Sequence, residues 1–160
     1  MKKISQGTTI IELLVYSSLL ALVLTILYAF YIQASEQRAL QITETEIYTN
    51  GYRILLDFQQ TVKRSTSVDY PPLRESAGSL ILNSGEIIYQ VNDQGELEKV
   101  EPGETNILTD QKVEVESLTF AVLGPSASNP TIKMSFTLKG KHRTGGRERR
   151  ESFQTAVTLP

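Results

Sequence analysis

The sequence predicts an α+β fold in which one long N-terminal helix, transmembrane in its first half, packs its second half on an antiparallel β-sheet head. Three observations predict this fold. An almost unbroken apolar run occupies residues 10–32, helical periodicity continues to about residue 64, and the rest of the chain alternates apolar and polar residues in short runs. A chain of 160 residues leaves room for one head domain beyond the apolar run.

The apolar run comes first in the chain and is long enough to cross a bilayer. About 20 apolar residues, at about 1.5 Å per residue, span the hydrocarbon core. Lys2 and Lys3 precede the run. Because positive charge stays on the cytoplasmic side, we expect a single-pass protein of the cytoplasmic (inner) membrane with an extracytoplasmic C-terminal head.

Glu12 lies near the start of this apolar run. A carboxylate in a membrane helix costs roughly 2.5–3.5 kcal/mol at the bilayer centre and less near an interface, so it requires a partner. Lys2 and Lys3 are within one or two turns if the helix extends upstream. If the chain is cut after Gly7, the new amine of Thr8 lies four residues before Glu12 and could pair with Glu12 of a neighbouring subunit.

Residues 7–15, Gly-Thr-Thr-Ile-Ile-Glu-Leu-Leu-Val, resemble the leader junction of type IV pilins and type II secretion pseudopilins. In that family motif, a glycine precedes the cleaved bond and a glutamate follows at the fifth mature position, inside a hydrophobic helix. The short basic leader also fits. It differs from an ordinary secretory signal, whose apolar region lies before the cut and is discarded.

The resemblance implies that a prepilin peptidase cleaves between Gly7 and Thr8, methylates the amine of Thr8, and leaves Glu12 to act in subunit assembly. The family usually has phenylalanine at the position of Thr8, and this difference weakens the expectation of methylation more than that of cleavage. The predicted regions are a cleaved leader at 1–7, a transmembrane and filament-core helix at 8–33, an amphipathic continuation at 34–64 and a β-rich head at 65–160.

The continuation at 34–64 is expected to pack one stripe on the head. Its apolar residues recur at helical spacing: Leu40, Ile47, Ile54, Leu55, Phe58 and Val62. The opposite face is expected to carry the charges: Glu36, Arg38, Glu44, Glu46, Arg53, Asp57 and Lys63. Gly51 could permit the close approach of a strand or be merely tolerated, and we favour tolerance. We expect Tyr48 and Tyr52 to pack on the head. The hydroxyl-rich residues 65–67 and Tyr70-Pro71-Pro72 end the helix near Arg64.

The head is expected to contain about six or seven antiparallel strands. Turn signals at 83–85 and 92–95 separate three short runs, which indicates a three-stranded meander. Later runs at 112–123, 131–138 and 152–159 alternate in the same way, with loops at 124–130 and 139–150. The order of these runs resembles the heads of minor pseudopilins, the J-type of type II secretion and its type IV pilus counterparts.

Little in the sequence indicates chemistry. The chain has no cysteine, which excludes thiol catalysis and cysteine metal sites, and its only histidine is His142, among cations. Asp93 in its turn is too little for calcium, which takes six to eight oxygen ligands. No nucleophile, phosphate-loop or nucleotide motif is present. We therefore expect no enzyme, no cofactor and no metal.

The segment 139–150 is the one strongly charged stretch. It carries two lysines and four arginines with one glutamate: Lys139, Lys141, Arg143, Arg147, Arg149 and Arg150. Such a loop could contact nucleic acid by releasing counterions, could dock on an acidic patch of a partner subunit, or could remain solvated. It lacks an aromatic residue for base stacking. The whole chain, with 16 basic and 18 acidic residues, has no bulk attraction for polyanions.

The sequence thus predicts a minor pilin or pseudopilin, a non-enzymatic subunit that primes or caps assembly of a type IV pilus or type II secretion pseudopilus. Its expected partners are other pilin or pseudopilin subunits, the prepilin peptidase and the cell membrane, and the assembled filament would be periplasmic or at the cell surface. Two alternatives stay open: a DNA-binding minor pilin of a DNA-uptake pilus, and an uncleaved, signal-anchored binding ectodomain. Secretion, motility and DNA uptake are all compatible with these features.

Overall fold

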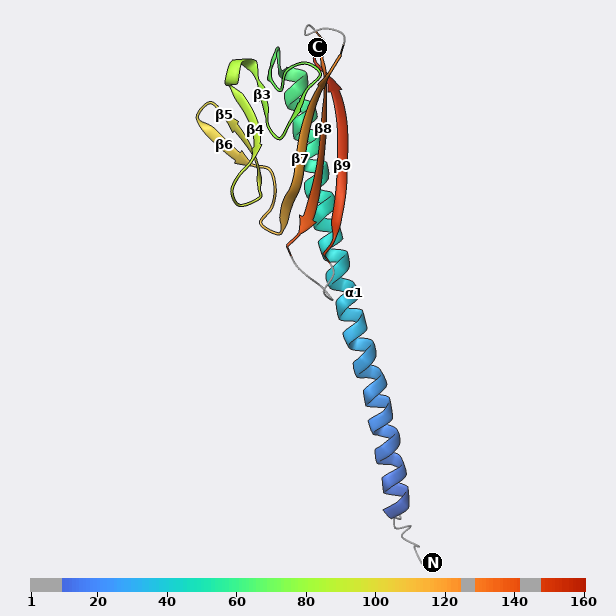
Figure 1. The fold of residues 1–160 in the computed structure, drawn as a ribbon. Helices are drawn as coiled ribbons and strands as arrows, with labels where there is room; N and C mark the ends of the chain where they lie inside the picture. The colour runs from blue at the N-terminus through green and yellow to red at the C-terminus, as the bar shows by residue number, and fades with distance from the viewer. Residues whose placement is uncertain (1–9, 125–128, 142–147) are drawn as a thin grey trace, which may run out of the picture. The chain divides into compact units, whose positions relative to one another are not determined.

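A computed structural model describes residues 10–124, 129–141 and 148–160, except for the side chain of Ala39. The fold is α+β: one long helix followed by two antiparallel sheets (Figure 1). The chain forms two compact units, Met1–Ala39 and Leu40–Pro160. The helix α1 (Ile10–Arg64) contributes its first part to one unit and its second part to the other.

The C-terminus of α1 lies where the sequence predicts it. Ser65 ends the helix by hydrogen bonding to carbonyl groups of the last turn. Its N–H donates to the carbonyl of Val62 at 3.2 Å, and its hydroxyl donates to the carbonyl of Thr61 at 2.9 Å. The next N–H, of Thr66, donates to the side-chain oxygen of Asn83 at 2.8 Å. The end of the helix is therefore tied to a turn of the first sheet.

The first sheet has the strand order β1-β3-β4-β5-β6. Its strands are β1 (Val68–Tyr70), β3 (Leu80–Leu82), β4 (Ile87–Val91), β5 (Leu97–Glu101) and β6 (Glu104–Ile107). The predicted meander is confirmed as β3-β4-β5, and β6 extends it. The turn after β4 forms because the side chain of Asn92 accepts hydrogen bonds from the N–H groups of Gln94 and Glu96, each at 2.9 Å.

The second sheet has the strand order β2-β7-β8-β9. Its strands are β2 (Ser76–Ala77), β7 (Val113–Leu123), β8 (Thr131–Gly140) and β9 (Arg150–Thr158). The described residues thus form nine strands in two sheets, where the sequence analysis expected six or seven strands and one sheet. The three short strands β1, β2 and β6 account for the difference, since stretches this brief leave no readable alternation.

The core lies between the second half of α1 and the two sheets. Ile47, Ile54, Phe58 and Val62 are fully buried, as their spacing predicts. They meet Tyr89 of the first sheet and Phe120 of the second, whose rings each lie about 6 Å from that of Phe58. One helix stripe therefore serves both sheets, and Figure 1 shows this part of α1 running alongside β7, β8 and β9.

Gly51 is required rather than tolerated, which corrects our interpretation of the sequence. The ring of Phe153 in β9 lies so close to its Cα that an added Cβ atom would overlap the ring. The glycine lets β9 approach the helix, and Phe153 also stacks on Phe136 with centroids 5.2 Å apart. The strand contact compensates for the helix propensity that glycine lacks.

The outer face of the helix differs from the expectation as well. Several charged side chains lie on its flanks and pair with strands or their connections: Glu46 with Lys112, Glu44 with Arg149, and Asp57 with Lys99. Of the two tyrosines expected to pack on the head, Tyr48 makes an edge-to-face contact with Phe153, whereas Tyr52 is 63% exposed. The prediction is therefore wrong for Tyr52.

Candidate functional site

The first part of α1 exposes its apolar side chains in the single chain. Every large hydrophobic residue described from Ile10 to Ile32 is at least 40% exposed. By length and composition, α1 is the one described helix that could cross a membrane. In water such a surface would be unfavourable, because each square ångström of exposed apolar area costs about 25 cal/mol. This part of the helix therefore requires lipid or protein around it.

The serine and threonine hydroxyls in and just after this apolar part donate to carbonyls of the helix itself. Ser17 and Ser18 donate to carbonyls three residues earlier, at 3.0 and 2.9 Å. Thr25 donates to the carbonyl of Ala21 at 2.8 Å, and Ser35 to that of Ile32 at 2.8 Å. Because each hydroxyl proton has an acceptor, these side chains can enter an apolar environment without leaving a donor unpaired.

Glu12 lies in the first turn of α1 as the structure describes it. The hydroxyl of Tyr16, one turn later, donates to Glu12 Oε1 at 3.3 Å. Gly7 and Thr8, the predicted cleavage and methylation sites, lie outside the described residues, so those two assignments stay predictions.

The second part of α1 also exposes apolar residues. On the face turned away from the sheets, Ile42, Tyr52 and Leu56 are each between 55 and 65% exposed. Their spacing of ten and four residues places them within one stripe of a 3.6-residue helix. Periodicity alone did not separate this stripe from the buried one, because the chain carries apolar residues on both sides of the helix.

Three of the four basic side chains that the structure describes in segment 139–150 pair with acids of the same chain. Lys139 pairs with Glu148 at 3.3 Å, and Arg149 pairs with Glu44 of α1 at 2.6 Å. Arg150 lies 3.1 Å from both Glu116 and Glu148. Of the predicted contact residues that the structure describes, Lys141 alone lacks an ion pair. Arg143 and Arg147, together with His142, lie outside the described residues.

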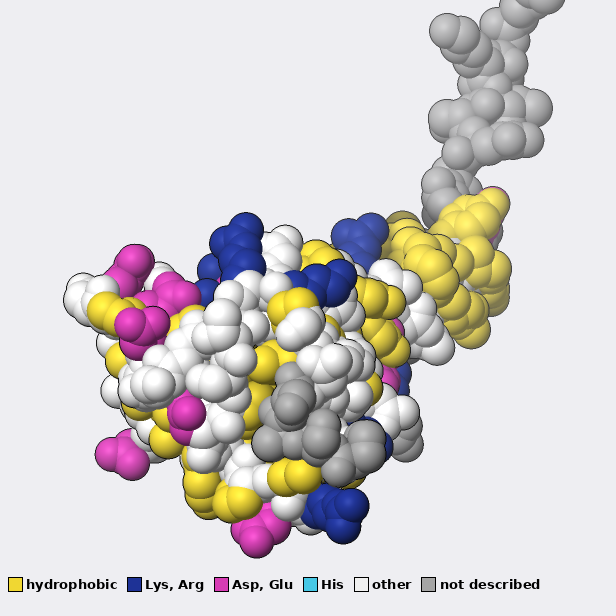
Figure 2. Space-filling model, turned by 90° about the horizontal axis from the view of Figure 1, so that it is seen from above, with side chains coloured by type: hydrophobic (Ala, Val, Ile, Leu, Met, Phe, Trp, Pro, Cys, Tyr) yellow, Lys and Arg dark blue, Asp and Glu magenta, His cyan; other side chains and the backbone are white. Residues whose placement is uncertain are grey.

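The charges of the head are also dispersed on the face shown in Figure 2. Lysine and arginine side chains stand at separate places there, while acidic side chains gather at the left end of the view. The hairpin β5–β6, which lies on that side in Figure 1, carries Glu98, Glu101 and Glu104. This distribution is unlike the continuous basic surface by which proteins track a phosphate backbone.

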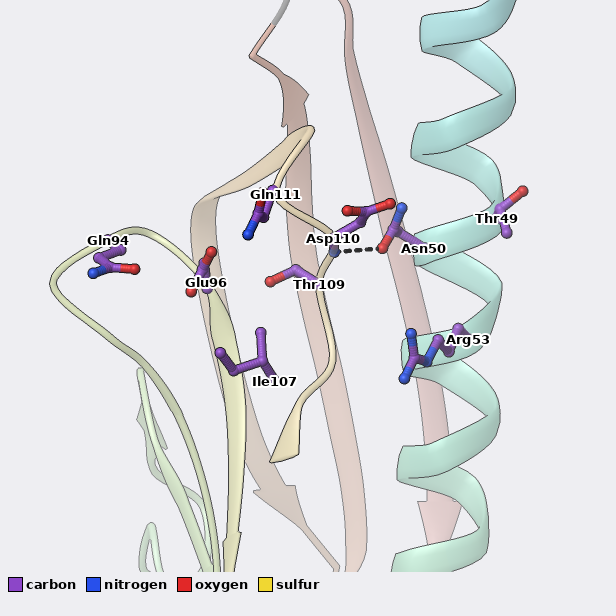
Figure 3. A pocket seen from close by; sticks show the side chains of 9 residues that line it. All are labelled: Thr49, Asn50, Arg53, Gln94, Glu96, Ile107, Thr109, Asp110 and Gln111. Carbon is purple, nitrogen blue, oxygen red and sulfur yellow. Dashed lines mark hydrogen bonds between the residues drawn. The ribbon is translucent and has the colours of Figure 1, made fainter. Parts of the chain in front are cut away.

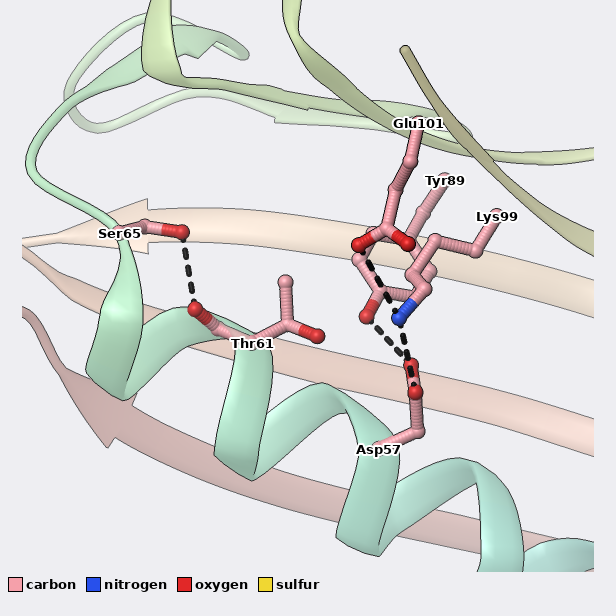
Figure 4. Close-up of polar contacts among 6 residues, drawn as sticks. All are labelled: Asp57, Thr61, Ser65, Tyr89, Lys99 and Glu101. Carbon is pink, nitrogen blue, oxygen red and sulfur yellow. Dashed lines mark hydrogen bonds and ion pairs between the residues drawn. The ribbon is translucent and has the colours of Figure 1, made fainter. Parts of the chain in front are cut away.

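A partly buried polar cluster joins α1 to the first sheet (Figure 4). Asp57 accepts a hydrogen bond from the hydroxyl of Tyr89 at 2.6 Å and one from Lys99 Nζ at 2.9 Å. Lys99 Nζ also lies 3.4 Å from Glu101. Sequence analysis did not identify this cluster, although Lys99 shares the inward strand face of Leu97, which was the available signal.

The cluster shifts the pKa values of its members. Burial raises the pKa of Tyr89 above its ordinary value, and the hydrogen bond and negative charge of Asp57 act in the same direction. Burial by itself would lower the pKa of Lys99, but the hydrogen bond and charge of Asp57, together with Glu101, outweigh it and raise that pKa. Tyr89 therefore stays neutral and Lys99 stays charged, which holds the helix on the sheet.

A polar cavity of about 530 Å³ opens between α1 and the connections of the first sheet (Figure 3). Asn50 closes one side by accepting a hydrogen bond from the N–H of Asp110 at 2.8 Å, and Arg53 lines the helix side. Glu96, buried at the far wall, accepts from the amide of Asn92 at 3.3 Å.

A metal site would require several convergent ligands. Within residues 10–124, 129–141 and 148–160, no group of three or more histidine, aspartate or glutamate side chains is placed to hold one ion.

Comparison with known proteins adds no relative to these observations. No family model, no curated protein and no solved structure matches the chain.

Proposed function

We propose that the chain is a minor pilin or pseudopilin: a non-enzymatic, membrane-held subunit that primes or caps the assembly of a type IV pilus or type II secretion pseudopilus. One observation carries the proposal. An acidic residue, Glu12, lies at the start of a helical segment whose large apolar side chains are all exposed in the single chain. A segment of this kind suits a subunit that exchanges lipid for neighbouring helices.

Before assembly, the apolar segment lies in the inner membrane with Glu12 near its cytoplasmic edge. The hydrogen bond from Tyr16 lowers the cost of the carboxylate there. After cleavage between Gly7 and Thr8, each subunit carries a new amine, methylated or not, four residues before its own Glu12. Glu12 of an incoming subunit then pairs with the Thr8 amine of its neighbour, which sets the axial register of the two helices.

The second part of α1 supports the same role. Its inner stripe holds the head through Phe58 and its neighbours, while Ile42, Tyr52 and Leu56 stay exposed on the outer stripe. Bundled helices would bury Ile42 and Leu56 of the outer stripe against each other, as heterologous contacts repeated along a filament. The head then faces outward and needs no chemistry of its own.

The first test is the intact mass and the N-terminal peptide of the membrane-extracted protein, with and without a prepilin peptidase. We expect a chain beginning at Thr8 only when the peptidase is present. A chain beginning at Met1 in both samples would remove the amine that Glu12 needs, and a signal-anchored ectodomain would replace this proposal.

The second test is Glu12→Ala, with Glu36→Ala as the matched control outside the apolar run. We expect Glu12→Ala to insert and to keep a folded head, yet to reduce co-purification with partner subunits and filament number at least about tenfold, the effect of losing a desolvated ion pair. Glu36→Ala should assemble normally. Normal assembly of Glu12→Ala would refute the register mechanism.

A further inference from the structure

The four sheet edges of the head differ in how they are protected. β1 has three residues and a register irregularity, β2 has two residues, and β6 has four. The edge strand β9 has nine residues and contains no proline, glycine or register irregularity. Natural edge strands are usually shortened, bulged or charged, because an open edge pairs with other chains. β9 carries none of these protections beyond the charges of Arg150 and Glu151 at its start.

The open edge of β9 presents a regular set of backbone groups. At the two ends of the ladder, the carbonyl of Arg149 accepts from Gly140 N–H at 3.0 Å and the N–H of Leu159 donates to the Pro130 carbonyl at 3.0 Å. Odd-numbered residues of β9 therefore bond to β8. By alternation, the N–H and C=O groups of Ser152, Gln154, Ala156 and Thr158 point away from it. Within the described residues, β9 pairs with no second strand.

The two faces of β9 differ in the side chains that a neighbouring strand would contact. The residues whose backbone faces outward also carry the exposed side chains, and these are small or uncharged after Arg150. The alternate residues face the helix: Phe153 packs against Tyr48 and Gly51, and Thr155 accepts a hydrogen bond from Gln59 at 3.1 Å. An added strand would continue both faces.

A groove on α1 lies beside this open edge. It has a volume of about 490 Å³ and is lined by Gln41, Glu44, Thr45, Tyr48, Thr49 and Tyr52. Two of its residues contact β9 or the residue before it, since Tyr48 meets Phe153 and Glu44 pairs with Arg149. Tyr52 is 63% exposed in it. Apolar side chains of an added strand would cover this tyrosine.

We propose that the β9 edge and this groove bind an extended segment of a partner polypeptide, which adds to the second sheet as an antiparallel strand. The segment carries small polar residues at the positions that continue the exposed face and apolar residues at the positions that cover Tyr48 and Tyr52. Alternating outward donors and acceptors over nine residues are satisfied by another extended backbone. This inference concerns the head alone and goes beyond the role of Glu12 in assembly.

A separate partner fits better than a second copy of the chain. Antiparallel pairing of two β9 strands centred on Gln154 would set the carboxylate of Glu151 opposite Val157, which is buried in the core. This pairing of two copies would thus place a charged residue opposite an apolar residue at both ends of the strand pair, which disfavours a second copy as the partner.

The test uses the full-length chain in detergent micelles and a fluorescent nonapeptide probe of alternating threonine and valine, with two lysines after it for solubility. In an antiparallel pair, threonines on the exposed face direct their N–H groups toward β9, and valines on the groove face direct theirs away. The matched controls are the same peptide N-methylated on the threonines or on the valines. Binding is measured by fluorescence anisotropy, and amide hydrogen exchange is followed in β9.

We expect the unmodified and valine-methylated peptides to bind alike, and threonine methylation to weaken binding at least about tenfold, because it removes several hydrogen bonds. Bound peptide should protect the amides of Ser152, Gln154 and Ala156. Gln154→Pro, which removes an outward N–H, should weaken binding comparably, and Gln154→Ala should not. Tyr52→Ser should weaken it more than Arg53→Ala.

Three results would overturn the proposal. One is the absence of binding by the unmodified peptide, and another is equal binding of both methylated peptides. The third is self-association of the peptide-free chain that Gln154→Pro abolishes, since the occupant would then be a second copy. None of these depends on Glu12, so Glu12→Ala should bind the peptide normally even if its own assembly defect is absent.

Discussion

The two parts of α1 show how one secondary structure can serve two environments. From Ile10 to Ile32, apolar side chains surround the helix and stay exposed in the single chain, and the serine and threonine hydroxyls bond back to their own helix. After residue 40, one stripe is fully buried, and charged residues on the flanks pair with strands. Phe30 and Phe58 illustrate the contrast, since the first is 69% exposed and the second is fully buried.

The difference separates folding from assembly. Contacts of the second part are made within the chain, so they contribute to the free energy of unfolding of the head. In the proposed function, the first part contacts lipid or neighbouring subunits, so it would contribute to insertion and association. Substitutions in the two parts should therefore change different measured quantities.

The largest expected effect is that of Phe58→Ala. Deleting this ring from the centre of the core should lower the free energy of unfolding of the head by about 4 kcal/mol. Phe30→Ala removes the same atoms from the exposed part and should change that quantity by less than about 0.5 kcal/mol. Urea denaturation in mild detergent, followed by near-ultraviolet circular dichroism, measures both. Equal losses for the two variants would contradict the separation of the two parts.

Asp57→Ala should have the next largest effect. It leaves Lys99 buried with Glu101 as its remaining acid, so the free energy of unfolding should fall by about 3 kcal/mol. Asp93→Ala, at an exposed turn, is the matched control and should cost less than about 0.5 kcal/mol. The same denaturation measurement applies. A loss below about 1 kcal/mol for Asp57→Ala would mean that packing alone holds the helix on the first sheet.

Tyr89 gives the head a sensitivity to alkaline pH. Its pKa is raised in the folded state, so the stabilisation is complete below the unfolded value of about 10 and declines as the pH rises above it. The raised pKa of Lys99 acts with the same sign. We expect Tyr89→Phe to cost about 1.5 kcal/mol at pH 7 and to flatten the decline above about pH 10. Melting temperatures between neutral and alkaline pH measure this, and an unchanged alkaline slope would refute the assignment.

Arg149→Ala should have the smallest effect. Its pair with Glu44 is half exposed, and solvent screening limits such pairs to about 0.5 kcal/mol or less. A double-mutant cycle with Glu44→Ala measures the coupling. Because the guanidinium of Arg149 is already paired with Glu44, we also expect that Arg149→Ala does not reduce any salt-sensitive binding to DNA. Salt-sensitive DNA binding that Arg149→Ala does reduce would favour the DNA-uptake alternative over a solvated role for segment 139–150.

The long helix was predictable because its signals are local. A run without proline, a 3.6-residue period and the hydroxyl and proline residues after Arg64 locate it, and the structure confirms its end. The burial of Ile47, Ile54, Phe58 and Val62 follows from the same period. Which outer residues stay exposed was not predictable, because the ring contact of Tyr48 is with Phe153, a residue about a hundred positions later.

The remaining features depend on contacts between distant residues. The split into two sheets rests on β2 pairing with β7 and on β6 extending the meander, and these strands are too short to show a pattern. The partners of Asp57 and Arg149 are set by the packing of strands on the helix. The role of Gly51 was predicted wrongly for the same reason, because the need for a glycine is evident only once β9 is packed against the helix. The junction at Gly7, Thr8 and Glu12, by contrast, is recognised from sequence and lies partly outside the described residues.

The helix-to-head contacts also determine how the head would respond to mechanical load. Glu46–Lys112, Asn50–Asp110, Asp57–Lys99 and Gln59–Thr155 link α1 to both sheets and to the connection between β6 and β7. A force pulling α1 along its axis would load these links in shear and at the same time, rather than opening them one after another. The Thr66–Asn83 hydrogen bond ties the end of the helix to the first sheet, so it too would bear part of that force. The head would therefore resist extraction of its helix as a single cooperative unit, with a rupture rate governed by the barrier to unfolding the whole core.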